Sequence, residues 1–178
     1  MNDKQVQYEE YYKAIEDSSQ AITLEPDNAA AFYRRAVAYR DLGKPLRALQ
    51  DLNRVITLAP DNAAGFYQRA VIYDTLGKPL RALQDLNRVI ELRPRYAAAF
   101  YNRGVIYDTL GETLRAIEEY DRAIELDPDY ALPFHNRGHC YVDLLQPERA
   151  LKDLLRAREL KLDKSLPFFN RGLTYDAI

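Results

Sequence analysis

The sequence predicts an all-α fold, an α-solenoid in which antiparallel helix pairs stack into a right-handed superhelix with a 34-residue period. Two observations predict it: residue types recur at that spacing, and each period holds two segments with helical patterning. Prolines recur at Pro26, Pro60, Pro94 and Pro128. The other series in phase are Phe32, Phe66, Phe100, Phe134 and Phe168; Arg35, Arg69, Arg103, Arg137 and Arg171; and Tyr39, Tyr73, Tyr107, Tyr141 and Tyr175.

The period divides residues 1–178 into a single repeat array when each repeat ends two residues after its proline. The blocks are 1–28 (partial), 29–62, 63–96, 97–130, 131–164 and 165–178 (partial). Blocks 29–62 and 63–96 agree at 25 of 34 positions. The first block lacks its opening and the last stops within its first helix, so both ends are expected to be boundaries of a larger array.

Each block predicts two helices separated by a turn. In 97–130 the first helix is expected from about Ala97 to Leu110, where apolar residues recur at three- and four-residue spacing. Gly111 stops it, and the second helix begins near Thr113. The second helices of three other blocks open with a proline, which is tolerated in the first turn: Pro45, Pro79 and Pro147. Leu145 replaces the turn glycine of its block, so this turn is expected to differ.

Composition excludes several classes of protein. With 25 Lys and Arg against 27 Asp and Glu, the chain is not expected to bind nucleic acid through a basic surface. It contains no run of 18 apolar residues, so no insertion into a membrane is expected. The single cysteine, Cys140, excludes an internal disulfide. No signal peptide opens the chain and a cytoplasmic location is expected, although the shortened first repeat leaves open a leader lost upstream.

The block FYNRGVIYDTLGETLRAIEEYDRAIELDPDY resembles a tetratricopeptide repeat, and the resemblance extends over essentially the whole chain. That motif has an early aromatic, a small residue four later, then tyrosine, alanine and a final proline. Here the roles fall to Phe100, Gly104, Tyr107, Ala116 and Pro128. Phenylalanine replaces the usual tryptophan, and arginine stands where many members have leucine, which makes these repeats of an Arg-Gly type.

The recurring arginines need partners, because a charge on a packing face is costly unless it is paired. Acids recur in the second helices at Asp17, Asp51, Asp85, Glu119 and Asp153. Arg69, for example, lies between Asp51 and Asp85 in the sequence. We expect an internal ladder in which each arginine is partly buried and paired with an acid of its own or the preceding repeat. The alternative is a row of guanidinium groups that binds a ligand.

The tetratricopeptide resemblance implies that the first helices line a concave groove. The groove positions carried over from the family are Tyr33, Arg34, Tyr67, Gln68, Tyr101, Asn102, His135, Asn136, His139, Phe169 and Asn170. Acids flank them at Asp74, Asp108 and Asp143. Such a surface suits an extended or helical peptide with apolar anchors and a basic group. Tyrosine and asparagine are also common framework residues of the family, so a purely structural role stays open.

The sequence matches neither of two further kinds of site. Some family members clamp a C-terminal carboxylate with lysine, asparagine and arginine on successive first helices; here the lysine positions hold tyrosine or alanine, so no clamp is expected. His135, His139 and Asp143 are spaced to share one helix face, but the set of ligands for zinc is incomplete, and neither a metal nor a cofactor is expected. No nucleophile and base recur together, which argues against an enzyme.

The sequence thus predicts a non-catalytic scaffold that binds a protein or peptide in its concave groove. The alternative is a structural module that self-associates through its open terminal repeats, since a terminal repeat normally needs a polar cap. An engineered or excised array is a third alternative, suggested by the near-identical middle blocks.

Overall fold

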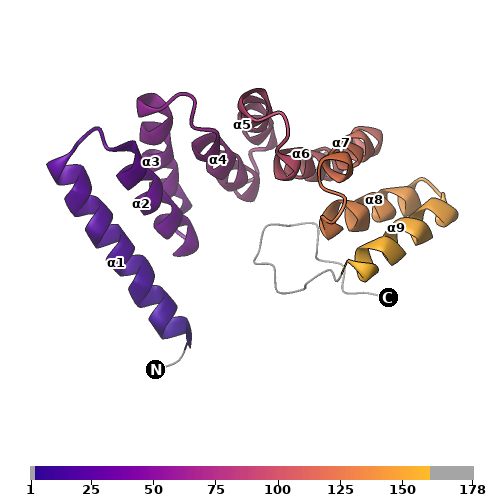
Figure 1. Ribbon diagram of the computed structural model, residues 1–178, viewed down its shortest axis with the longest axis horizontal. Coiled ribbons are helices and arrows are strands. Elements are labelled where there is room, and N and C mark those ends of the chain that lie inside the picture. Colours follow the sequence, from indigo (N-terminus) through magenta and orange to yellow (C-terminus); the bar gives the residue numbers. More distant parts are fainter. Residues whose placement is uncertain (1–2, 161–178) are drawn as a thin grey trace.

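The computed structural model describes residues 3–160, which form helices without strands. The helices are α1 (Asp3–Leu24), α2 (Ala29–Asp41), α3 (Pro45–Leu58), α4 (Ala63–Thr75), α5 (Pro79–Leu92), α6 (Ala97–Thr109), α7 (Thr113–Leu126), α8 (Ala131–Asp143) and α9 (Pro147–Glu159). They stack in chain order along an open arc (Figure 1). The all-α solenoid predicted from the sequence is therefore confirmed. No helix in residues 3–160 is long and apolar enough to cross a membrane.

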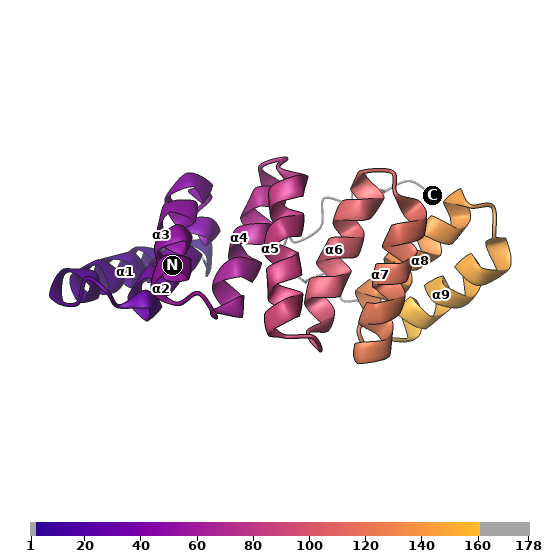
Figure 2. The same cartoon turned by 90° about the horizontal axis from the view of Figure 1, so that it is seen from above.

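Each full repeat packs its two helices against each other, as α2 on α3, α4 on α5, α6 on α7 and α8 on α9. Successive first helices also contact each other directly, α2 with α4, α4 with α6 and α6 with α8. In Figure 1, α4 and α6 follow the inner side of the arc, and α5 and α7 follow its outer side. We call the surface of α2, α4, α6 and α8 the inner face. Figure 2 shows α1 and α9 at the two ends of the stack.

Small residues allow the paired helices to approach closely. Ala48 in α3, Ala82 in α5 and Ala116 in α7 are completely buried, so no larger side chain would fit there. Four in-phase tyrosines have a different role, because each lies under an arginine of the second helix of its repeat: Tyr39, Tyr73, Tyr107 and Tyr141. Arg47 and Arg81 lie 5.6 Å above the rings of Tyr39 and Tyr73, within the range of a cation–π contact.

The turns between paired helices use residues in the left-handed backbone region. Gly43, Gly77 and Gly111 have φ values of 66°, 66° and 77°, which glycine adopts without steric cost. Leu145 adopts φ 55° at the same place in its repeat. Its N–H donates to Val142 O at 2.9 Å, just as the N–H of Gly111 donates to Asp108 O at 2.9 Å. The expectation that this turn differs is wrong, because the surrounding helices impose the turn on a residue that does not favour it.

Leu145→Gly is therefore expected to stabilise the protein, by about 0.5–1 kcal/mol. The leucine side chain is 88% exposed, so its removal loses little packing. Relief of the left-handed strain outweighs the entropy that glycine adds to the unfolded chain. The measurement is urea unfolding followed by circular dichroism, with Gly111→Leu as the reverse substitution. A lower midpoint for Leu145→Gly would contradict this interpretation.

Candidate functional site

Three of the in-phase arginines form two-pronged ion pairs with an aspartate sixteen residues later. In the pairs Arg35–Asp51, Arg69–Asp85 and Arg137–Asp153, Nε and Nη2 donate to the two carboxylate oxygens at 2.7–2.8 Å. The three aspartates are buried. Each arginine also lies over the phenylalanine three residues earlier, as Arg69 does over Phe66 at 5.7 Å. The guanidinium groups are thus internal links between paired helices.

The fourth pair is imperfect because its acid is a glutamate. Arg103 Nη2 donates to one oxygen of Glu119 at 2.8 Å. Arg103 Nε and the second carboxylate oxygen, Oε2, are buried without a hydrogen-bond partner. Burial raises the pKa of Glu119 above its usual value, although the bond from Arg103 opposes that shift. The extra methylene of glutamate thus coincides with the loss of the two-pronged geometry.

Each arginine has a further partner in the preceding repeat that the sequence analysis missed. Nη1 donates to a residue sixteen positions earlier, to Asn53 from Arg69 and to Asn87 from Arg103, both at 2.8 Å. The corresponding partners of Arg35 and Arg137 are Ser19 and Asp121. The expected ladder pairs each arginine with an acid of its own or the preceding repeat, and the pairs within each repeat confirm it. In the preceding repeat the partner lies two residues after the ladder acid, and it is itself an acid only for Arg137, which binds Asp121. The sequence did carry a signal for these partners, because a polar residue lies sixteen positions before each of these arginines as well as sixteen positions after it.

Two ladder residues differ from the other members. Asp17 is exposed on α1. Sixteen residues before it the sequence has Met1, where the other repeats have an arginine. Arg171 lies outside the described residues, as do Phe169 and Asn170 of the predicted groove.

Part of the predicted groove is accessible on the inner face. Tyr33, Gln68 and Asn102 are half-buried, and Arg34 and His139 are exposed. Arg40 donates to the Gln68 side chain, which links α2 to α4.

Tyr67 and Asn102 link the next two inner helices. Asn102 Nδ2 donates to the Tyr67 hydroxyl at 2.8 Å and so ties α6 to α4. Burial raises the pKa of Tyr67 to about 12, and the nearby Tyr96 adds to the shift while the Asn102 bond opposes it. These polar groups thus both connect neighbouring repeats and face the inner surface.

Tyr101 and Asn136 are buried, so the prediction that they face the groove is wrong. Tyr101 is only 1% exposed, with its ring 6.0 Å from that of Tyr120 and 5.2 Å from that of Tyr130. Asn136 Nδ2 donates to the Tyr101 hydroxyl at 3.3 Å. The bulky Tyr120, where the earlier repeats have leucine, fills the space behind Tyr101 and makes this position part of the core.

His135 and His139 lie side by side on α8. Their ring centres are 4.6 Å apart, edge to face. Burial, with a smaller effect of His139, lowers the pKa of His135, which favours the neutral imidazole. Cys140 is buried, and its thiol donates to Asp108 on α6 at 3.5 Å. Within the described chain, no three histidine, cysteine or acidic side chains come together to hold a metal ion.

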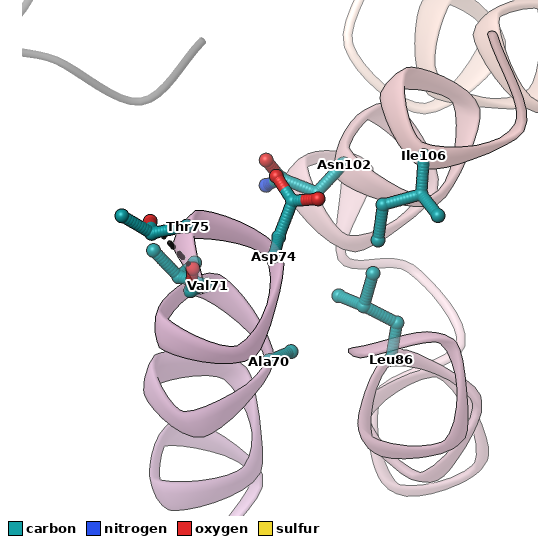
Figure 3. Close-up of a pocket in the computed structure, with 7 residues that line it drawn as sticks. All are labelled: Ala70, Val71, Asp74, Thr75, Leu86, Asn102 and Ile106. Carbon is teal, nitrogen blue, oxygen red and sulfur yellow. Dashed lines mark hydrogen bonds between the residues drawn. The ribbon is translucent and has the colours of Figure 1, made fainter. Parts of the chain in front are cut away.

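A small cleft opens between α4 and α6. It is lined by Ala70, Val71, Asp74, Thr75, Leu86, Asn102 and Ile106. Figure 3 shows the Asp74 carboxylate turned toward Asn102 across the cleft, with Leu86 and Ile106 closing its apolar floor. The cavity volume is about 20 Å³, enough for one water molecule.

A larger hollow, of about 370 Å³, lies beside the Arg35–Asp51 pair on α2 and α3. Its charged side chains are engaged in ion pairs, Arg35 with Asp51 and Arg54 with Asp27. The hollow therefore presents no uncompensated charge to a ligand.

Comparison with known families identifies the architecture. Models described as tetratricopeptide repeat match residues 29–62 and 67–131. The chain is a tetratricopeptide repeat protein. No curated protein sequence matched it. Several solved tetratricopeptide structures share its fold.

A crystal structure of MamA is 25% identical, with 91% of this chain and 95% of that chain covered and a TM-score of 0.80. MamA from Desulfovibrio magneticus RS-1 is 22% identical over 93% of this chain and 99% of that chain, with a TM-score of 0.78. YrrB, described as a TPR protein with an unusual peptide-binding site, is 24% identical over 89% of this chain and 82% of that chain, with a TM-score of 0.72.

Proposed function

We propose that this tetratricopeptide protein is a non-catalytic scaffold whose inner face binds an extended or helical segment of a partner protein. Members of its family are typically non-catalytic interaction scaffolds, and YrrB is described as having a peptide-binding site. The observation that carries the proposal is that each of the successive first helices presents half-buried or exposed polar and aromatic side chains. These side chains are Tyr33, Arg34, Tyr67, Gln68, Asn102, His135 and His139.

The shape of the inner face favours a peptide over a small molecule. Small-molecule sites usually enclose about 300–1,000 Å³, whereas the cleft between α4 and α6 has about 20 Å³. A peptide needs no deep pocket, because its backbone bonds with surface amides and its side chains rest in shallow depressions. Gln68 and Asn102 supply such amides. The exposed acid Asp143 at the end of α8 favours a basic residue in the ligand.

Selection of random 12-residue displayed peptides on the immobilised protein tests this proposal. Peptides with apolar anchors and a basic residue are expected, and Tyr33→Ala or His139→Ala should weaken their binding by about tenfold. His139 is exposed, whereas Tyr33 is half-buried and packs against the core of α2 and α3. Neither forms a ladder pair, and circular dichroism checks that both variants keep the helix content of the wild type.

Leu80→Ala is the matched control. Leu80 is 70% exposed but lies on the second helix α5, away from the inner face. Selected peptides whose affinity falls with Leu80→Ala and not with Tyr33→Ala or His139→Ala would overturn the proposal. So would a failure to select any peptide.

A further inference from the structure

A leucine recurs at one exposed position of three second helices. Leu46 in α3, Leu80 in α5 and Leu114 in α7 each occupy the second residue of their helix, at the 34-residue spacing. Their side chains are 71%, 70% and 67% exposed. A single exposed leucine is ordinary. Three at the same position are not explained by packing, because most of each side chain contacts no other part of the chain.

Two of these leucines lie among cations without a nearby acid. Residues 43–50 and 77–84 have the same sequence, GKPLRALQ, which contains a lysine and an arginine but no acid. Arg47 and Arg81 are exposed and lie against tyrosine rings. Neither arginine and neither lysine forms an ion pair with a residue from 3 to 160. We call this surface the basic leucine patch, and it consists of Lys44, Leu46, Arg47, Lys78, Leu80 and Arg81.

The third leucine has different surroundings. Glu112 stands at the position that Lys78 has in the preceding repeat, and it forms an ion pair with Arg115 at 2.6 Å. A second exposed acid, Glu118, lies on the same helix. Leu114 is therefore as exposed as the leucines of the patch, but the charge beside it is neutralised.

The two halves of the patch are close enough for one short segment to contact both. Helix α4 packs against both α3 and α5. Packed helices have axes about 8–10 Å apart, so the axes of α3 and α5 lie within about 20 Å of each other. A helix of about 14 residues, or an extended segment of about 7, spans that distance.

We propose that the basic leucine patch binds an acidic segment of a partner protein. Apolar side chains of that segment would contact Leu46 and Leu80, and its carboxylates would pair with the four cations. Complementary charge fixes the register of such a segment and speeds its encounter with the patch. The proposal does not depend on the inner-face proposal, because the patch lies on the second helices and takes a ligand of the opposite charge.

The surroundings of the patch favour a protein segment over other anions. A nucleic acid is held mainly through its phosphates, which leaves the two leucines without an apolar partner. An anionic membrane surface would extend over α7 as well, where the exposed acids Glu112 and Glu118 repel it. A short acidic segment can end before it reaches those acids.

Selection from a displayed library tests the proposal on the full 178-residue chain. The library consists of peptides of about 14 residues built from aspartate, glutamate, leucine, phenylalanine, serine and glycine. Peptides with both acidic and apolar residues are expected, and fluorescence anisotropy measures their affinity. Arg47→Glu/Arg81→Glu should weaken binding by about tenfold or more, and Leu46→Ala/Leu80→Ala by about tenfold. Lysine in place of the peptide's acids should restore binding to the Arg47→Glu/Arg81→Glu variant.

Leu114→Ala is the matched control, because it removes an equally exposed leucine from a neutralised site. It should change the affinity by less than about twofold. His139→Ala should also leave acidic peptides bound, and Leu80→Ala should leave basic inner-face peptides bound, so the two proposals fail separately. Circular dichroism should show equal helix content for all variants.

Three results would overturn the proposal. The first is that no library peptide binds more tightly than about 1 mM. The second is that Leu114→Ala weakens binding as much as Leu46→Ala/Leu80→Ala does. The third is that phosphatidylserine vesicles or a single-stranded DNA bind the wild type and not Arg47→Glu/Arg81→Glu, while the selected acidic peptides bind both equally.

Discussion

Asp85→Ala is expected to lower the free energy of unfolding by about 3 kcal/mol. The Asp85 side chain is 6% exposed, and its two carboxylate oxygens accept hydrogen bonds from Nε and Nη2 of Arg69. Its removal leaves a positive charge between two helices without a carboxylate. Arg69 keeps its bond to Asn53 and is 21% exposed, so the cost should lie at the lower end of the range for a broken buried pair.

The measurement is urea unfolding by circular dichroism, with Glu119→Ala as the comparison. Glu119 accepts one hydrogen bond from Arg103, and the pair already leaves two polar atoms unsatisfied, so removal of Glu119 should cost only about 1–2 kcal/mol. The apolar pair Arg69→Met/Asp85→Leu should be close to neutral, because no buried charge then remains unpaired. Equal losses for Asp85→Ala and Glu119→Ala would contradict the role assigned to the two-pronged geometry.

Gly104→Ala is expected to cost about 2 kcal/mol, although alanine favours a helix more than glycine does. A methyl group there would lie 2.6 Å from Cε1 of Tyr120. The Tyr120 ring is completely buried, so it has no free space to move into. Helices α6 and α7 would have to separate, and the loss should appear in thermal unfolding.

A double-mutant cycle tests the cause of that loss. Earlier repeats bury an alanine and a leucine together at the equivalent positions, Ala36 with Leu52 and Ala70 with Leu86. Gly104→Ala/Tyr120→Leu reproduces that pairing and should be less destabilised than the sum of the single variants, by more than about 1 kcal/mol. Strictly additive losses would show that the clash with Tyr120 is not the cause.

Most of the helical frame could be predicted from residue spacing. The first helix of block 97–130 begins at Ala97 as expected and ends one residue early, at Thr109. The second runs from Thr113 to Leu126. Glycine, proline and helical periodicity act over a few residues, so the helix boundaries that they set can be predicted from the sequence alone. Leu145 shows where such local prediction fails, because the helices on either side impose a left-handed turn that leucine does not favour by itself.

The candidate site was less predictable, since equivalent positions in the period differ in burial. Tyr67 and Tyr101 occupy the same position, yet Tyr67 is half-buried and Tyr101 is 1% exposed. The difference arises from a third residue, which is Leu86 in one repeat and Tyr120 in the next. A period assigns each residue a position, but the size of its neighbours decides whether solvent reaches it.

The sequence by itself determined the 34-residue period and the order of helices, and it predicted that the recurring arginines pair with recurring acids of their own or the preceding repeat. These depend on local backbone preferences and on residue types fixed at regular spacing. Only the tertiary structure decided which polar group of the preceding repeat binds each arginine, which inner-face residues are buried, and that Asp17 is exposed on α1. Those features depend on how side chains of different repeats meet, and contacts between helices far apart in the chain are set by packing in three dimensions.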